Sequence, residues 1–228
     1  TLNGAQNLTI TAGTGNVTFT GAVGGTARLG TLNIVSAGNV VAAALTLAAF
    51  DQDAGTGTTT FGGAVNTSTA AGVVVANTSL VVNAGVTTAS SGVVTFLQSG
   101  TTTIAAAGDI SSDGAVTITS SGGTTTSGDI TTTVDAIQFA SATTFGGAVA
   151  LVSANGAVTF SSTLNGAQNL TITAGTGLVT FTGAVGGTTR LGTLNIVSAG
   201  DVTAAALTLA AFDQDAGTGT TTFGGAVN

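Results

Sequence analysis

Short segments in which one polar residue lies between two apolar residues recur along the whole chain. Examples are Leu8–Ile10, Val17–Phe19, Leu32–Ile34, Leu45–Leu47, Val94–Phe96, Val116–Ile118, Ile137–Phe139 and Val158–Phe160. This alternation, with its β-branched residues and Phe, is typical of strands that bury one face. Gly, Asn, Asp and Ser stand between the segments and favour tight turns. The pattern therefore predicts many short β-strands joined by tight turns.

The sequence also repeats over a long distance. Residues 1–66 return as residues 163–228, an offset of 162, with 62 of 66 positions identical. The four differences are Asn16/Leu178, Ala27/Thr189, Asn39/Asp201 and Val41/Thr203. We interpret 1–162 as one full repeat unit and 163–228 as a partial second copy, within a single continuous solenoid over 1–228. We expect the chain to be a segment of a longer array.

A shorter period lies within the long one. The triplet Gly-Ala-Val begins at Gly21, Gly63, Gly147, Gly183 and Gly225, and three of the four intervals are multiples of 21 residues. A short period of this kind indicates a solenoid. We predict an all-β fold, a parallel β-solenoid with about eight coils of about 20 residues per 162-residue repeat. Leu, Ile, Val and Phe should point inward and Thr outward, with coils stacked about 4.8 Å apart.

One segment allows a different interpretation. Val40–Phe50 is rich in Ala and Leu, which favour helix, and Asn39 is a suitable N-cap. A coil with small inward residues agrees better with the 42-residue spacing that runs through the segment. We therefore favour the coil over a short helix.

Composition narrows the possible functions. The chain has nine Asp, two Arg, and no His, Lys, Cys, Trp or Tyr, which gives a net charge of -7. Histidine bases, lysine chemistry, disulfides and Cys or His metal sites are thereby excluded. Two Arg cannot neutralise the phosphates of a nucleic acid, and the longest apolar run is too short to cross a bilayer. We expect no cofactor, no nucleic-acid partner and no membrane span in this segment.

Three segments carry a resemblance to a known class of proteins: Gly15–Val23, Gly30–Val40 and Ala54–Val65. With their repetition they resemble the repeat regions of large bacterial surface proteins, namely filamentous-haemagglutinin-like exoproteins, autotransporter passengers and related β-strand-repeat adhesins. The resemblance covers the whole chain. It implies a right-handed parallel β-helix, an extracellular or cell-surface location, and roles in adhesion, biofilm or sheath formation.

The carboxylate pairs Asp51/Asp53 and Asp213/Asp215 are the candidate metal ligands, since two carboxylates in a turn can contribute to a calcium site. The calcium-binding β-roll motif is not present, and a solvated acidic turn is the simpler interpretation. Paired carboxylates are also what a glycosidase requires, but the chain has no Trp or Tyr for sugar stacking. We predict no catalytic residues.

Arg28 and Arg190 occupy the same position in the two copies. A side chain exposed at a turn is the favoured interpretation, and contact with an acidic neighbour such as Asp51 or Asp53 is the alternative. A surface ion pair would contribute only about 0–1 kcal/mol.

Threonine is the most informative polar residue. Thr9 and Thr11, Thr18 and Thr20, and Thr117 and Thr119 each place two Thr outward around one inward residue. Flat Thr ladders occur in ice-binding solenoids, yet the irregular spacing here indicates that no single face collects them all. These six Thr are the candidate binding residues.

The combined features predict a structural extracellular filament or surface-adhesin stalk, a stiff rod without catalysis. Its partners would be copies of itself, through covalent continuation of the array or through head-to-tail and lateral stacking. The alternative is a surface-binding module in which the Thr ladders contact a glycan, a host surface or ice.

Overall fold

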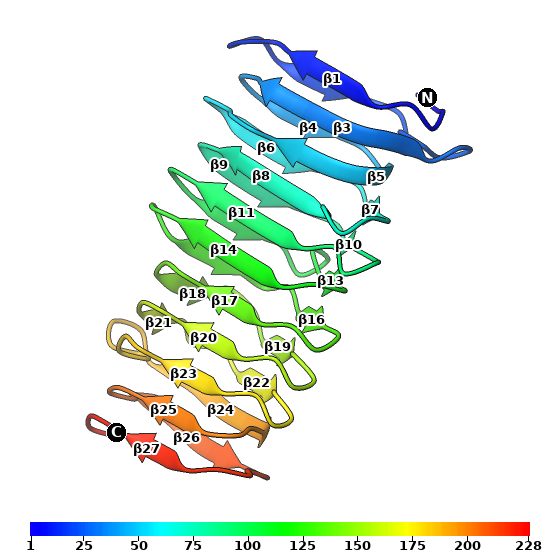
Figure 1. The fold of residues 1–228 in the computed structure, drawn as a ribbon. Coiled ribbons are helices and arrows are strands. Elements are labelled where there is room, and N and C mark those ends of the chain that lie inside the picture. Colours follow the sequence, from blue (N-terminus) through cyan, green and yellow to red (C-terminus); the bar gives the residue numbers. More distant parts are fainter.

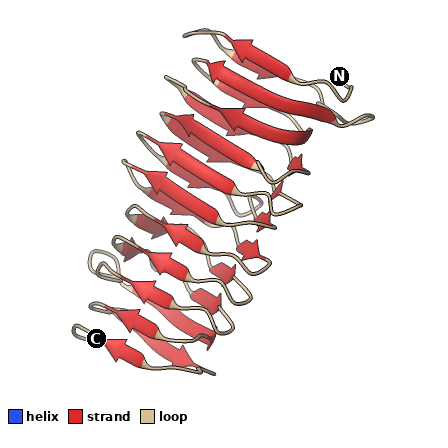
Figure 2. Cartoon of the chain, in the orientation of Figure 1, coloured by secondary structure: helices blue, strands red, loops and turns tan.

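The computed structural model describes residues 1–228 and contains 27 β-strands and no helix (Figures 1 and 2). All strand pairings are parallel, and the chain winds into a β-solenoid of about 10 turns. The predicted fold class is confirmed. The helix alternative at Val40–Phe50 is wrong, because this segment forms parts of two strands. In Figure 1 the front strands run from right to left as the chain descends and returns behind them, so the coil is right-handed.

Each turn passes through three faces, which we name A, B and C in chain order. Face A, at the front of Figure 1, contains β1 (Leu8–Thr11), β3 (Leu29–Ser36), β5 (Leu45–Gln52), β8 (Val73–Asn77), β11 (Val94–Gln98), β14 (Val116–Ser120), β17 (Ile137–Phe139), β20 (Val158–Phe160), β23 (Val179–Phe181), β25 (Val202–Ala204) and β27 (Thr221–Phe223). Along face A, inward residues of successive coils are 18 to 24 positions apart in the sequence. The first such pair is Leu8 and Leu32, and the last is Val202 and Thr221. The turns therefore absorb the variation in coil length.

Face B lies behind and to the left in Figure 1. It contains β2 (Val17–Phe19), β4 (Val40–Ala42), β6 (Thr58–Phe61), β9 (Ser79–Val82), β12 (Thr102–Ile104), β15 (Thr124–Thr126), β18 (Thr143–Phe145) and β21 (Leu164–Asn165). Single bridges extend it through Val185 and Leu207 to Val227.

Face C is on the right. It contains β7 (Val65–Thr67), β10 (Val86–Thr87), β13 (Ile110–Ser112), β16 (Ile130–Thr132), β19 (Val149–Val152), β22 (Leu170–Thr173), β24 (Leu191–Ser198) and β26 (Leu209–Gln214). The long strands β3 and β5 bend from face C into face A, because their first residues pair toward β7 and their last residues pair with β1 and β8.

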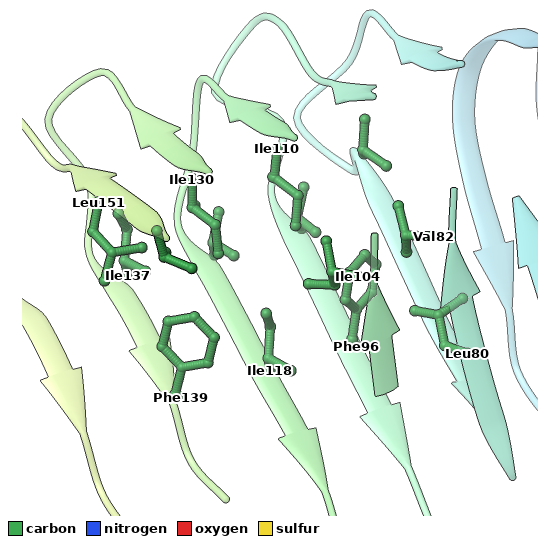
Figure 3. Packing of buried hydrophobic residues seen from close by; sticks show 14 of the residues in the cluster. Leu80, Val82, Phe96, Ile104, Ile110, Ile118, Ile130, Ile137, Phe139 and Leu151 are labelled. Atoms are coloured by element: carbon green, nitrogen blue, oxygen red, sulfur yellow. The ribbon is translucent and has the colours of Figure 1, made fainter. Parts of the chain in front are cut away.

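The interior is one continuous apolar column. A cluster of 47 buried residues extends through the rod, with side chains from all three faces converging on the axis (Figure 3). Phe139, Phe160 and Phe181 stack in successive coils, with ring centroids 4.8 and 5.3 Å apart and nearly parallel planes. The stack follows from the parallel register, which places equivalent side chains directly above one another.

Some threonines depart from the expected outward orientation. Thr59, Thr102, Thr124 and Thr143 are fully or almost fully buried, because each occupies the first inward position of its face-B strand. In the runs Thr58–Thr60 and Thr101–Thr103 the central residue therefore points inward. The expectation that Thr lies outside therefore fails wherever Thr occupies an inward position of the strand, and holds at the alternate positions, such as Thr103 and Thr125.

The two sequence copies have the same local structure but occupy different faces. Leu8 lies on face A, and seven steps of the face-A register lead to Val158. Leu164 and Leu170 follow on faces B and C, so Leu170, the copy of Leu8, lies two faces further on. The 162-residue offset therefore corresponds to seven turns and two faces, and each element of the second copy is rotated by one face from its counterpart in the first.

Local geometry survives this rotation. The register shift between Ile10 and Thr11 recurs between Ile172 and Thr173. The edge-on pair Phe50–Phe61 recurs as Phe212–Phe223, with 5.2 Å between centroids and an 86° interplanar angle in each copy. The same sequence thus builds the same corner wherever it falls around the axis.

Truncation of Phe160 should show how much the apolar column contributes to stability. Phe160 is 1% exposed and stacks on an aromatic ring in the coil above and another in the coil below, so Phe160→Ala should cost about 3–5 kcal/mol of unfolding free energy. Phe223→Ala in the last coil, where the side chain is 41% exposed, is the matched control and should cost far less. Denaturant unfolding followed by circular dichroism measures both, and equal losses would contradict the stacked column.

Candidate functional site

The surface of the rod has no pocket. No group of three or more His, Cys, Asp or Glu side chains is arranged to hold a metal ion. No helix that could span a membrane occurs in the structure. The surface consists of flat sheet faces and the turns between them, so candidate residues are described by face and coil.

The pair Asp51 and Asp53 lies at the end of β5 on face A. Asp51 is an outward residue whose backbone neighbours in the adjacent coils are Asn33 and Val74. Partial burial, with a smaller contribution from the nearby Asp53 carboxylate, raises the pKa of Asp51. Of the copies, Asp213 lies on β26 of face C, beside Asn195 of β24, and Asp215 directly follows β26. The two pairs therefore point in different directions from the axis, and neither is joined by a third carboxylate.

The raised pKa of Asp51 predicts a pH effect on stability. The folded state binds the Asp51 proton more tightly than the unfolded state does, so stability from this group falls as pH rises through the acidic range. Asp51→Asn should therefore raise the melting temperature at pH 7, and the gain should disappear below about pH 3.8, the ordinary Asp value. Thermal melts at both pH values measure the effect, with Asp135→Asn as a control at a carboxylate outside the pair. A gain that persisted at low pH would contradict the explanation.

Several other acidic and amide side chains join neighbouring coils through the backbone. Asp109 accepts a hydrogen bond from the N–H of Asp129 at 2.9 Å, and Asp129 accepts one from Ala150 at 2.8 Å. Asn39 accepts the N–H of Thr58 at 2.8 Å, and its counterpart Asp201 accepts that of Thr220 at 2.6 Å. These carboxylates and amides stabilise the turns.

The two arginines bind carbonyl oxygens of later coils. The Arg28 guanidinium donates to Leu47 O in the next coil at 2.6 Å and to Asn66 O one coil further at 3.1 Å. Arg190 donates to Leu209 O at 2.6 Å. The sequence had suggested a contact with Asp51 or Asp53 as an alternative, but the Arg28 guanidinium donates to these carbonyl oxygens instead. Both arginine side chains are exposed, and their hydrogen bonds link successive coils along the axis.

The six candidate threonines fall on two faces. Thr9, Thr11, Thr117 and Thr119 belong to face A, and Thr18 and Thr20 to face B. Thr9 and Thr117 stand in one outward column, but four residues separate them, namely Asn33, Asp51, Val74 and Thr95.

The lower part of face A contains a regular column that the residue spacing did not predict. Its outward residues in successive coils are Thr95, Thr117, Gln138, Thr159, Thr180, Thr203 and Thr222. Variable turn lengths obscure this column in the sequence. Alignment of the apolar–polar–apolar segments, instead of a fixed period, would have revealed it.

A buried polar network at the corner between faces A and B also had no sequence-based prediction. Thr59 donates to Gln52 Oε1 at 2.6 Å, and Thr102 shares hydrogen bonds with Gln98 Oε1 at 2.8 Å and Ser120 Oγ at 2.6 Å. Gln98 also donates to Val75 O at 2.9 Å, in the preceding coil. These polar side chains are buried because they are hydrogen-bonded to one another and to the backbone.

This network should be sensitive to loss of a single hydroxyl. Thr102→Val keeps the shape of the side chain but leaves Gln98 Oε1 without its donor, which should cost about 1–3 kcal/mol of unfolding free energy. The matched control is Thr103→Val, one residue on and exposed, which should change stability by no more than about 0.5 kcal/mol. Urea unfolding of the two variants measures the difference. A neutral Thr102→Val would show that the corner does not depend on the network.

Comparison of the chain with known protein families, with curated proteins and with solved structures gave no match.

Proposed function

We propose that this chain is a segment of a structural extracellular rod, either a bacterial surface-adhesin stalk or a filament, without catalytic activity. The observation that carries the proposal is the parallel stacking of coils through both strands and turns. Of 140 backbone hydrogen bonds, 71 lie outside regular strand pairing, and many of these join the turns of adjacent coils, such as Gly38 N to Gly15 O. A rod bonded on every side resists bending and local opening.

The partners that this proposal assigns to the rod are further repeats of the same array, or copies of the chain stacked head to tail. Each inner coil pairs in parallel with the coils on both sides of it, as β11 does with β8 and β14, so an added coil of the same geometry would meet the same backbone groups.

The surface is consistent with mechanical use. Charged residues make up 5% of the chain, and several of the carboxylates serve the turns. Arg28 and Arg190 are the only sites for trypsin-like cleavage, and both guanidinium groups are held by carbonyls of the next coil. The resemblance to β-strand-repeat adhesins points to the same role and to an extracellular or cell-surface location.

Electron microscopy of the purified chain tests this proposal. Ten turns at about 4.8 Å each predict rods about 48 Å long for one chain, and longer rods of unchanged width where ends stack. Aligned fibres should diffract at about 4.8 Å along the rod axis. Globular particles, or a 4.8 Å reflection perpendicular to the rod, would contradict the proposal.

The second candidate function is surface binding through threonine. The observation that favours it is the regular outward column on face A from Thr95 to Thr222. A flat face with a hydroxyl in six of seven coils, and an amide at Gln138 in the seventh, is suited to a repetitive, uncharged surface such as a glycan.

A further inference from the structure

The chain contains three Asn-Gly pairs, a sequence that can lose ammonia without an enzyme. They are Asn3–Gly4, Asn155–Gly156 and Asn165–Gly166. The backbone nitrogen of the glycine can attack the side-chain amide of the asparagine, because glycine has no Cβ that obstructs the approach. The glycine nitrogen and the amide carbon must first meet in a suitable orientation. Since the three pairs share one chemistry, their contacts in the fold decide which of them reacts.

The pair Asn165–Gly166 is held between coils. Asn165 ends β21 on face B, and its Oδ1 accepts the backbone N–H of Thr188 at 2.9 Å and that of Thr189 at 3.2 Å, both in the following coil. The Gly166 N–H donates to the Thr189 carbonyl at 3.3 Å. Gly166 is buried, and a Cβ there would meet the Phe145 carbonyl of the preceding coil. Neighbouring coils therefore fix both reacting groups.

The pair Asn3–Gly4 repeats this arrangement in the first copy. Asn3 Oδ1 accepts the N–H of Thr26 at 2.9 Å and that of Ala27 at 3.3 Å. The Gly4 N–H donates to the Ala27 carbonyl at 3.2 Å. Gly4 and Gly166 also have the same backbone conformation, with φ of +127° and +126°. The two copied pairs thus share one conformation in which both reacting groups are hydrogen-bonded to the next coil.

The pair Asn155–Gly156 belongs to a turn whose backbone is bonded only to itself. The turn joins β19 to β20 (Figure 1). The N–H groups of Asn155 and Gly156 both donate to the Ser153 carbonyl, at 2.6 and 2.8 Å. The Ser153 hydroxyl donates back to the Gly156 carbonyl at 2.6 Å. No backbone group of residues 154–156 is hydrogen-bonded to another coil.

Two further features make this turn easier to open. Asn155 is exposed, and its Oδ1 is held only by Thr176 of the next coil, whose N–H and hydroxyl donate at 3.1 and 3.0 Å. Ala154 has φ of +57°, a left-handed conformation that is unfavourable for a residue with a Cβ. Gly156 is buried, so the reaction still requires the turn to open. A strained turn with local bonds opens at a lower free energy than a strand bonded between two coils.

We propose that Asn155 is a site of spontaneous deamidation in the folded rod, and that Asn3 and Asn165 are protected. The Gly156 nitrogen forms a bond with Cγ of Asn155, and the bond from Cγ to the side-chain nitrogen breaks. Ammonia leaves with the proton that the Gly156 nitrogen gives up. One water molecule then opens the resulting succinimide to aspartate or isoaspartate. This chemistry does not depend on the proposed function.

The aspartate product would add a carboxylate to the rod and keep the contact with the next coil. The net charge of -7 would become one unit more negative. The two copies already show that a carboxylate can replace an amide in this role. Asn39 Oδ1 accepts the N–H of Thr58 at 2.8 Å, and its counterpart Asp201 accepts that of Thr220 at 2.6 Å. An aspartate at position 155 would offer Thr176 the same acceptor.

Incubation of the folded chain at mildly alkaline pH tests the proposal. Samples are digested with pepsin at acidic pH, and mass spectrometry of the peptides detects the exchange of an amide for an acid. Asn155 should be modified at least about tenfold faster than Asn165, because its turn opens without separating the backbones of two coils. In the control, a chain unfolded in urea, the three pairs should react at similar rates.

A substitution in the turn separates the effect of the fold from that of the sequence. Ser153→Ala removes the hydroxyl that closes the turn onto Gly156, and should speed the modification of Asn155 several-fold without changing that of Asn165. The matched control is Thr163→Ala, which also lies two residues before an Asn-Gly pair but is exposed, and it should change neither rate. Circular dichroism melts identify a variant that fails to fold, and the wild-type comparison stands without it.

Three outcomes would overturn the proposal. The first is equal modification of Asn155 and Asn165 in the folded chain. The second is an unmodified Asn155 at a time when the urea-unfolded chain has reacted completely. The third is a folded Ser153→Ala variant in which Asn155 reacts at the wild-type rate. Electron microscopy tests the proposed function separately, so either proposal can fail alone.

Discussion

The whole structure depends on one constraint, which is that each coil completes the backbone hydrogen bonds of the coils above and below it. Parallel pairing at about 4.8 Å forces equivalent residues to stand directly over one another. An inward position must therefore be filled in every coil by a side chain compatible with its two neighbours, as in the stack of Phe139, Phe160 and Phe181. Turns are under no such restriction, and coil lengths range from 18 to 24 residues.

This constraint explains how one sequence can occupy two different faces. The inward columns of faces A, B and C all hold mainly Val, Leu, Ile and Phe, so each face can accept a segment whose register it meets. The repeat therefore has to span a whole number of faces but not a whole number of turns. It spans 23 faces, which at three faces per turn is seven turns and two faces. Glycines at the sharpest corner travel with the segment: Gly24 and Gly186 have φ of +72° and +70°, and a Cβ there would lie about 2 Å from the Thr46 and Thr208 carbonyl oxygens.

The sequence contained enough information for the fold class, the coil length and the absence of helix, because alternation and repetition are local properties. The face to which each segment belongs cannot be derived from the sequence in the same way. The stacking register decides that Thr102 points inward and Thr103 outward, and the variable turn lengths hide this register in the sequence. The same reason explains why the sequence did not predict the corner network of Gln52 and Gln98. A polar residue in a solenoid sequence suggests a turn unless its burial is known. Arg28 was correctly placed at a turn, but its carbonyl partners lie 19 and 38 residues away.

The rotation between copies also determines where a repeated surface feature lies around the rod. If successive repeats were in phase, any surface feature would recur along one side of the rod and would form a single binding strip. Here the pair Asp51/Asp53 lies on face A and its copy Asp213/Asp215 on face C, so a feature that is simply repeated is distributed around the axis. The threonine column of face A is therefore assembled from different parts of the repeat, because Thr95 to Thr159 belong to the unrepeated middle of the chain and Thr180, Thr203 and Thr222 to the second copy. Thr180 and Thr222 are unchanged from Thr18 and Thr60 of face B, whereas Thr203 replaces Val41. A segment that lies on one face in the first copy thus continues a column on another face in the second copy with a single outward substitution in that column.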